Sequence, residues 1–288
     1  MNHASRTSPA ALPPSKDFGN SWYAAPAWVT GHISGWDAKF LHALIERERP
    51  SLVVEIGTAS GFSTAIIARS LDQVAGPSGG TTGFRLVTYD VAERFYADPS
   101  RRVGDATREM LPADLLGRVE FRNPRDATDA ARDFARDEVP FCFIDANHLH
   151  PWPALDLLSV IDIVRPGGTL VLHDVNLPSL PSVAANPQWA VHGVEWLFRD
   201  LDLAKEISTD PDGPPNIGSV RMPGDKARLR RQLLDIIHAH PWESAVDDRD
   251  LERRSLRRAG GPIAGLIRRL RRRFGHRPEP ISKRLVFR

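Results

Sequence analysis

Short apolar runs alternate with helix-like segments along the middle of the chain, and this alternation predicts the fold. Runs typical of buried strands lie at residues 52–56, 84–89, 119–122, 141–144 and 169–172. The segments between them have helical character, at about residues 61–71, 105–116, 128–135 and 153–164. Short apolar strands that alternate with helices indicate a parallel, doubly wound α/β sheet.

Segments on either side extend this pattern. Residues 37–49 have apolar side chains at helical spacing, namely Phe40, Leu41, Leu44 and Ile45, and Asp37 is the expected N-cap. After a loop-rich stretch, a short helix is expected at residues 194–201, and two last strands at residues 205–208 and 217–221. We therefore predict an α/β fold with a doubly wound, mostly parallel, seven-stranded Rossmann-like sheet and helices on both faces.

The distribution of charge divides the chain. The net charge is only +2, but residues 253–288 contain 13 Lys/Arg and one acid, and the other 252 residues contain 25 basic and 35 acidic residues. We expect four parts: an N-terminal extension (1–36), a main domain (37–222), a C-terminal helical segment (223–252) and a basic tail (253–288). An acidic body with a basic tail suggests two parts with different roles.

Composition favours a protein of a reducing compartment. Cys142 is the single cysteine, so an intrachain disulfide is impossible. The first twenty residues contain no apolar core of a signal peptide, and no stretch approaches the roughly 20 apolar residues that span a bilayer. We expect a cytoplasmic protein.

Acidic residues follow the predicted strands one after another. Ligands bind at the carboxyl ends of strands in such sheets, and the acids there are Glu55, Asp90, Asp126, Asp145 and Asp174. A single acid after a strand is commonplace, as a helix N-cap or in a solvated loop. Five at successive strand ends instead indicate a binding site. Residues 55–61 form a strand end, a glycine-containing turn and a helix start, which suits a nucleotide-like ligand. Glu55 would repel a pyrophosphate but suits a ligand with a cation or hydroxyls.

Residues 55–61 resemble the first motif of class I S-adenosylmethionine-dependent methyltransferases. Asp90 lies where that family places the acid that binds the ribose hydroxyls, and residues 125–127 resemble the segment whose acid contacts the adenine. Residues 165–168 resemble the turn before the family's fifth strand, and the likeness covers about residues 37–222. It implies that S-adenosylmethionine is the cofactor and that it is bound by Glu55, Gly57, Thr58, Ser60, Gly61, Asp90, Asp126 and Asp145.

A narrower resemblance concerns Asp145, His148, His173 and Asp174. Macrocin-type and catechol-type metal-dependent O-methyltransferases have an acid and a histidine after strand four and an acid after strand five. The resemblance implies Mg²⁺ held by Asp145 and Asp174, with Asp145 and His148 as catalytic residues and His148 as the general base. Catechol-type relatives have an Asn at the position of Val175, so the third ligand is unassigned. Asn147 and Asn176 are candidates. The alternative stays open that His148, His150 and His173 only fix loops or face solvent.

Other aromatic residues lie near these motifs. Tyr96 is expected either on the adenosine or in the core, and Trp152 either in the acceptor pocket or against the helix that follows it. Residues 176–200, which include Trp189, His192 and Trp196, are expected to shape the choice of substrate.

The basic tail has its own pattern. In residues 262–274 the apolar side chains share one helical face and most arginines lie off it. A basic amphipathic helix suits an anionic membrane surface, the acidic body of the protein or nucleic acid, and a solvated tail is the plain alternative. Nucleic acid is the least favoured of these. The expected partners are thus a small-molecule acceptor, a peripheral contact with the inner membrane surface and a second copy of the chain.

We predict an S-adenosylmethionine-dependent O-methyltransferase that acts on a sugar, a glycosylated natural product or another small polyhydroxylated acceptor. A nicotinamide-dependent oxidoreductase is the alternative among enzymes, although residues 55–61 lack the G-x-G-x-x-G pattern of such proteins. A non-catalytic nucleotide-binding module, with a tail that binds nucleic acid or membrane, is the alternative from another class.

Overall fold

The computed structural model describes residues 9–12, 23–75, 83–179, 192–209 and 215–241. The predicted basic tail therefore lies outside the described residues. Within the described part, no helix has the length and apolar character needed to cross a membrane.

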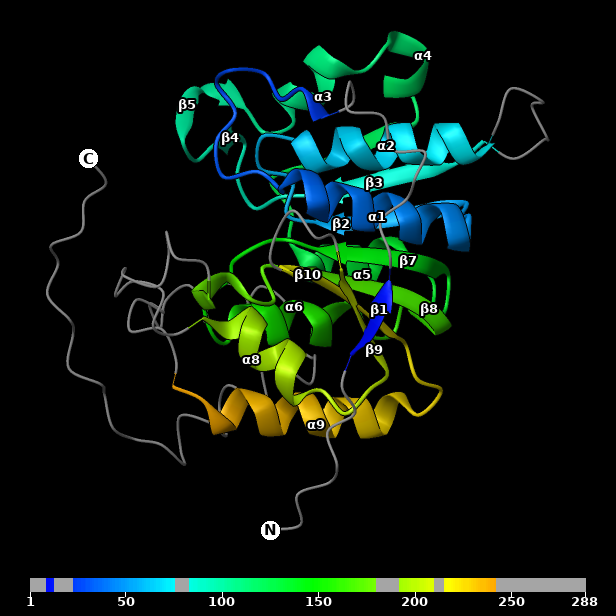
Figure 1. The fold of residues 1–288 in the computed structure, drawn as a ribbon, viewed down its shortest axis with the longest axis vertical. Coiled ribbons are helices and arrows are strands. Elements are labelled where there is room, and N and C mark those ends of the chain that lie inside the picture. Colours follow the sequence, from blue (N-terminus) through cyan, green and yellow to red (C-terminus); the bar gives the residue numbers. More distant parts are fainter. Residues whose placement is uncertain (1–8, 13–22, 76–82, 180–191, 210–214, 242–288) are drawn as a thin grey trace, which may run out of the picture. The chain divides into compact units, whose positions relative to one another are not determined.

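One mixed sheet organises the molecule (Figure 1). Its strands are β1 (Ala10–Leu12), β2 (Leu52–Ile56), β3 (Arg85–Tyr89), β6 (Val119–Arg122), β7 (Val139–Ile144), β8 (Val164–His173), β9 (Lys205–Ser208) and β10 (Ile217–Arg221). Their spatial order is β1-β9-β10-β8-β7-β2-β3-β6, and β10 runs antiparallel to both of its neighbours. The predicted seven strands and the mostly parallel, doubly wound architecture are confirmed, and the three-residue β1 adds an eighth strand beside β9.

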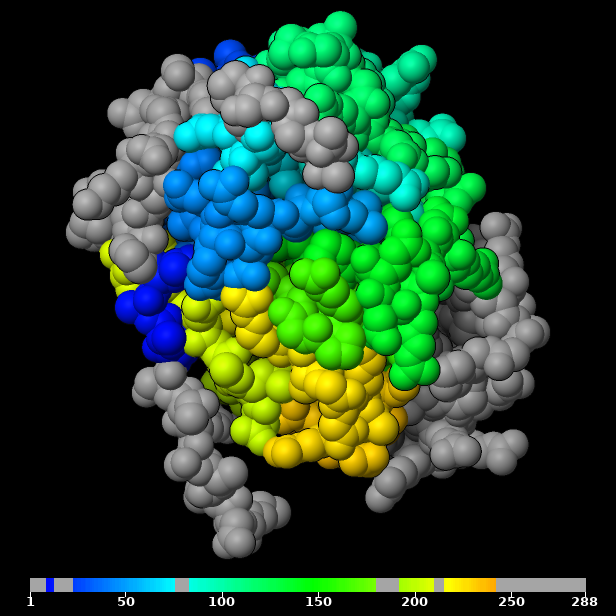
Figure 2. All heavy atoms as spheres, turned by 90° about the vertical axis from the view of Figure 1, so that its right-hand side faces the viewer, coloured from blue at the N-terminus to red at the C-terminus, as the bar shows by residue number. Residues whose placement is uncertain are grey.

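Helices cover both faces of this sheet. They are α1 (Gly35–Glu48), α2 (Phe62–Ala75), α3 (Asp105–Met110), α4 (Ala113–Leu116), α5 (Ala127–Asp133), α6 (Trp152–Val160), α8 (Gly193–Asp200) and α9 (Lys226–Ala239), with a short 3₁₀ turn at Leu177–Ser179. Helices α1 and α2 pack on each other, whereas α6 packs against α5, α8 and α9. In Figure 2 the blue atoms of α1 lie beside the cyan atoms of α2.

The core follows from the alternation of side chains along the strands. Every residue of β2 is buried. One side of the sheet packs under α1 and α2, whose apolar faces include the predicted Phe40, Leu41, Leu44 and Ile45. The same cluster takes Val53 from β2 and Phe141 and Phe143 from β7, while their neighbours in the strands face the other side. Because both faces are buried, the central strands read as continuous apolar runs in the sequence.

Three local expectations need correction. Helix α1 begins two residues earlier than predicted, and its N-cap is Ser34, not Asp37. The Ser34 hydroxyl accepts the Asp37 N–H, and the Asp37 side chain accepts the Ser34 N–H. The single helix predicted at residues 105–116 is two short helices, interrupted at Leu111 and Pro112. The turn predicted at residues 165–168 lies within β8, at a shift in its register with β7.

A hairpin that was not predicted stands between Asp90 and α3. It consists of β4 (Arg94–Phe95) and β5 (Asp98–Arg102), which pair antiparallel. Phe95 is buried and packs edge-on against Trp28 of the N-terminal segment. Tyr96, at the tip, is 66% exposed.

Candidate active site

The carboxyl ends of β2, β3 and β7 lie next to one another at one edge of the sheet. The N–H of Gly57 donates to the carbonyl of Tyr89 at 2.8 Å, and the N–H of Asp145 donates to the carbonyl of Ile56 at 2.8 Å. β3 lies on one side of β2 and β7 on the other. The direction in which the connections cross the sheet therefore reverses next to β2, and this edge contains the topological switch point. Open α/β sheets bind their ligands at such a point.

The glycines of the turn after β2 are required by its backbone. Gly57 has φ 103° and Gly61 has φ 87°, a region that side chains rarely adopt. A Cβ on Gly57 would overlap the backbone carbonyl of Asp145, and one on Gly61 would overlap the Thr107 hydroxyl. The turn is therefore a place where three segments of backbone come into close contact.

Glu55 lies beneath this turn. It is fully buried, and its two carboxylate oxygens accept hydrogen bonds from the Ser63 and Thr64 hydroxyls, each at 2.6 Å. Burial raises the pKa of the Glu55 carboxyl to about 7, although these hydroxyls act in the opposite direction. In this structure Glu55 ties the end of β2 to the first turn of α2, and its predicted contact with a cofactor stays a prediction.

Thr58 and Ser60 brace the turn from within. The Thr58 and Thr88 hydroxyls are 2.6 Å apart, and the Ser60 hydroxyl accepts the Phe62 N–H at 3.3 Å. Both side chains are buried. Their predicted cofactor contacts are likewise untested.

Asp90 and Asp126 lie beside one another through their backbones, since the N–H of Arg125 donates to the carbonyl of Asp90 at 2.7 Å. The two carboxylate oxygens of Asp90 accept the N–H groups of Ala59 and Ala92, both at 2.8 Å. A carboxylate has about four acceptor positions, so Asp90 keeps capacity for hydroxyl donors. Asp126 is the N-cap of α5 and accepts the N–H of Thr128.

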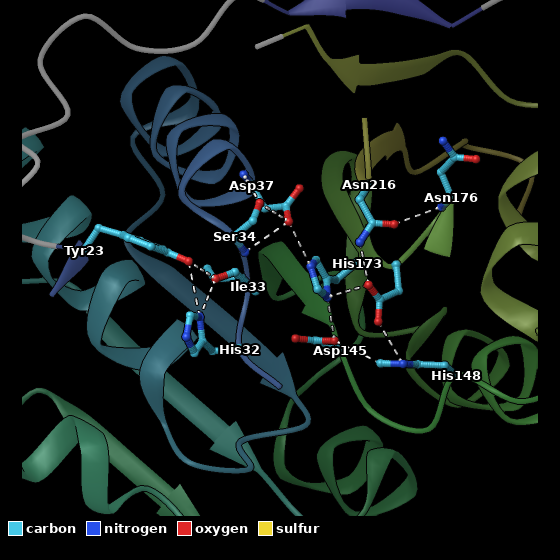
Figure 3. A network of polar contacts seen from close by, with 11 residues as sticks. Tyr23, His32, Ile33, Ser34, Asp37, Asp145, His148, His173, Asn176 and Asn216 are labelled. Atoms are coloured by element: carbon cyan, nitrogen blue, oxygen red, sulfur yellow. Dashed lines mark hydrogen bonds and ion pairs between the residues drawn. The ribbon is translucent and has the colours of Figure 1, made fainter. Parts of the chain in front are cut away.

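Asp145, His148 and Asp174 form a compact cluster at the same edge. Figure 3 shows Asp145 and His148 beside one another. The His148 Nε2 atom lies 3.2 Å from Asp145 Oδ1, and its Nδ1 atom lies 2.9 Å from Asp174 Oδ2. Ligand atoms of the three residues all lie within 4.8 Å of one another. The two acids predicted to hold a metal are thus adjacent, and His148 is the third member of a set that could hold a metal ion.

The protonation of His148 follows from its partners. A carboxylate can only accept, so both ring nitrogens of His148 donate in this arrangement and the ring is an imidazolium. Burial would lower its pKa, but the charges of Asp174 and Asp145 outweigh burial and raise it to about 9. Burial would raise the pKa of the Asp145 carboxyl, but His173 and His148 outweigh it and hold it well below its usual range. His148 can therefore act as a base only after it has released one carboxylate.

Two further residues orient the acids. His173 is 6% exposed, and its Nδ1 atom donates to Asp145 Oδ1 at 3.0 Å. The Asn216 side-chain amide donates to Asp174 Oδ1 at 2.6 Å. Of the candidate third ligands, the Asn147 side chain accepts the Leu149 N–H, and the backbone N–H of Asn176 donates to Asn216.

Sequence reasoning missed Asn216, which precedes β10. The antiparallel pairing of β10 places its first residue, Ile217, opposite His173, the last residue of β8. The start of an antiparallel strand therefore lies at the edge where its parallel neighbours end, and this rule could have identified Asn216.

The other aromatic candidates have different environments. Tyr96 is 66% exposed, and partial burial of its hydroxyl, with the negative charges of Asp145 and Asp174, raises the pKa of that hydroxyl. Trp152 begins α6, and Trp196 stacks on His240 with ring centroids 4.6 Å apart. Trp189 lies outside the described residues. An acceptor role for any of them is untested.

A comparison with known protein families matches the segment that forms this site. A family model described as a methyltransferase domain matches residues 54–175, the segment that contains the glycine turn, Asp90 and the Asp145–Asp174 cluster. None of the curated proteins matches the chain in sequence.

Solved structures with a similar fold include three that are 22–24% identical in sequence. Cofactor-bound Rv0187 from MTB has a TM-score of 0.49 and 22% identity, with 68% of this chain and 84% of that chain covered. The O-methyltransferase TomG from Streptomyces achromogenes, in complex with S-adenosylmethionine, has a TM-score of 0.47 and 24% identity, with 67% and 82% covered. An O-methyltransferase from Bacillus cereus, in complex with S-adenosylhomocysteine, has a TM-score of 0.47 and 22% identity, with 68% and 84% covered.

The segment that matches a methyltransferase domain is thus the segment that builds the switch-point site.

Proposed function

We propose that this chain methylates a hydroxyl of a small polyhydroxylated acceptor, such as a sugar or a glycosylated natural product, and that it uses a divalent cation. The observation that carries the proposal is the position of the Asp145–His148–Asp174 cluster, which shares a sheet edge with the glycine turn. A cofactor on the turn and a hydroxyl at the cluster would then be neighbours.

The two acids beside the turn fit S-adenosylmethionine. Asp90 retains acceptor capacity for two ribose hydroxyls, and Asp126 lies next to it, where the adenine would follow. When bound, S-adenosylmethionine would supply a methyl group to the acceptor oxygen, and its sulfur would keep the electron pair of the broken carbon–sulfur bond.

The cluster also fits a divalent cation. Asp145 and Asp174 offer carboxylate oxygens, which Mg²⁺ prefers, and both are held ionised by the surrounding histidines. These two acids would hold the cation as oxygen ligands. When bound, it would lower the pKa of the acceptor hydroxyl and hold that hydroxyl in place.

We assign proton removal to His148. Once a ring nitrogen has given up its hydrogen bond to Asp145 or Asp174 and lost its proton to solvent, which the partly exposed side chain reaches, it can take the hydroxyl proton. The backbone carbonyl of His148 accepts the Gly193 N–H at 2.7 Å, which fixes its loop. His148→Asn should therefore lower kcat without weakening cation binding. A loss of cation affinity would make His148 a ligand instead of the base.

The test begins with binding. Calorimetric titration of the full chain with S-adenosylhomocysteine and, separately, with NAD should show that only the former binds. Polyhydroxylated acceptors are then incubated with S-adenosylmethionine carrying a labelled methyl group, with Mg²⁺ or with chelator. Label in an ether linkage that depends on Mg²⁺ supports the proposal. Methyl transfer to nitrogen, or full activity in chelator, contradicts it.

A further inference from the structure

A second line of polar contacts leads from the cluster into the protein interior (Figure 3). His173 donates from Nδ1 to Asp145 Oδ1 at 3.0 Å and from Nε2 to Asp37 Oδ2 at 3.2 Å. Both of its partners are carboxylates, which only accept, so both ring nitrogens donate and the ring is a cation. His173 thus connects an acid of the site to an acid of α1, far away in the sequence.

Asp37 has a role in its helix that explains only part of its environment. As the third residue after the Ser34 N-cap, it accepts the Ser34 N–H at 3.2 Å and the Ser34 hydroxyl at 2.6 Å. These contacts complete a capping box. Capping residues usually lie at the surface, whereas Asp37 is 1% exposed and faces His173.

Burial of this pair has an energetic consequence. A buried carboxylate is costly unless a cation and hydrogen bonds compensate it, and His173 is the cation that contacts Asp37. The other oxygen of Asp37, Oδ1, is buried and has no hydrogen-bond partner among the described residues. The capping box could be built at the surface without this cost, so the buried position points to a second role.

We propose that Asp37 is a positioning residue for methyl transfer, which acts through His173 to fix the carboxylate of Asp145. The proposal rests on the function proposed above. Asp145 Oδ1 contacts both His173 and His148, so the rotation of this carboxylate determines where its other oxygen points. Groups that hydrogen-bond to ligands or catalytic acids typically change affinity or activity by about 10–100-fold when they are removed.

This role extends the site beyond the methyltransferase segment. The family match begins at residue 54, whereas Asp37 belongs to the preceding helix. Helix α1 packs on α2, and α2 begins directly after the glycine turn. The start of α1 is therefore fixed relative to both halves of the site, which is what a positioning residue requires.

The chain offers a matched pair of variants for the test. Asp37→Asn keeps an acceptor for Ser34 but removes the charge that faces His173. Ser34→Ala removes the N-cap hydroxyl and leaves Asp37 and His173 in place. With the full chain, Asp37→Asn should lower kcat at least 10-fold while the affinity for S-adenosylhomocysteine changes less than 2-fold. Ser34→Ala should lower the melting temperature and leave kcat within 2-fold, and Asp37→Glu should recover part of the loss. Equal kcat for Asp37→Asn and Ser34→Ala would overturn the proposal.

A readout without activity separates this inference from the proposed function. In ¹⁵N-histidine-labelled protein, the Nδ1–H of His173 should be protected from solvent exchange in the parent chain and in Ser34→Ala, and exchange faster in Asp37→Asn. This result would support the positioning role even if no acceptor were methylated. Unchanged protection in folded Asp37→Asn would contradict it, whatever the enzyme's activity.

Discussion

The two halves of the site hold their acids in different ways. On the proposed cofactor side, Asp90 and Asp126 accept hydrogen bonds from backbone N–H groups of turns and helix starts. On the proposed acceptor side, Asp145 and Asp174 are bonded to imidazolium rings and to Asn216. The first arrangement sets backbone dipoles against charge, with one donor from the distant Ala59 and the others within two residues of the acid.

The second arrangement is charge against charge and is built from distant segments. The histidine cations hydrogen-bond to the carboxylate oxygens, and a divalent cation would compete with His148 for the same oxygens. We therefore expect the proposed cofactor half to keep its arrangement when a ligand binds, whereas the proposed acceptor half should respond to the charge of what binds there. Substitutions in each half should therefore have different signatures.

The largest effect is expected at the turn that both halves share. Gly57→Ala combines a positive φ with overlap on the Asp145 carbonyl, so it should destabilise the fold by more than about 3 kcal/mol and abolish S-adenosylhomocysteine binding. Gly167→Ala is the control, because Gly167 also has a positive φ, of 74°, but a Cβ there would meet no atom of the described residues within 4 Å. It should cost about 1–2 kcal/mol. Chemical denaturation of both variants tests this, and equal losses would refute the close-approach argument.

The next effect separates the two halves. Asp174→Asn removes the charge that faces His148 and the predicted cation, so kcat should fall about 100-fold and stimulation by Mg²⁺ should disappear. Binding of S-adenosylhomocysteine, measured by calorimetry, should change less than 2-fold. If cofactor affinity fell together with kcat, the halves would not be independent.

A pH effect is expected from Glu55, beneath the turn. Its pKa is raised from 4.5 to about 7 in the folded protein, so the folded state binds the proton more tightly than the unfolded state. This stabilisation is present below about pH 4.5 and is lost as the pH rises through about 7, a loss of about 3 kcal/mol. Glu55→Gln keeps the shape without titrating, so its stability relative to the parent chain should rise by that amount between pH 4.5 and pH 8. If the free energies of unfolding of Glu55→Gln and the parent chain changed with pH in parallel across this range, the raised pKa of Glu55 would be contradicted.

The smallest effect concerns Asp126. Asp126→Ala removes the N-cap of α5 and should cost about 1 kcal/mol of stability, whereas Asp126→Asn keeps a good cap. If the carboxylate also contacts the adenine, Asp126→Asn should weaken S-adenosylhomocysteine binding a few-fold at unchanged stability. Unchanged affinity in Asp126→Asn would restrict Asp126 to capping.

The same contrast explains what the sequence could predict. The strands, their order along the chain and the glycine turn follow from apolar periodicity and local turn chemistry, so β2, β6, β9 and β10 were predicted at their observed bounds. The identities of the acids at the strand ends were also readable. Their neighbours were not, because Asp37, His173 and Asn216 meet only through the packing of α1 and the pairing of β10 with β8.

Protonation escaped prediction for a related reason. His148 was expected to be a base near neutral pH from its ordinary pKa, but two carboxylates contact its ring and convert it to an imidazolium. Only tertiary structure reveals that both of its nitrogens are occupied. Asp37 shows the same difficulty, since its position near a helix start suggested an N-cap and concealed its contact with His173.

The most direct test of the account is a crystal structure of the full chain with S-adenosylhomocysteine and Mn²⁺, in which the metal is located by anomalous scattering. The account predicts the ribose at Asp90, the metal at Asp145 and Asp174, and the cofactor sulfur facing the metal site. A cofactor whose sulfur points away from these acids, or a metal bound elsewhere, would contradict the claim that the two halves form one site.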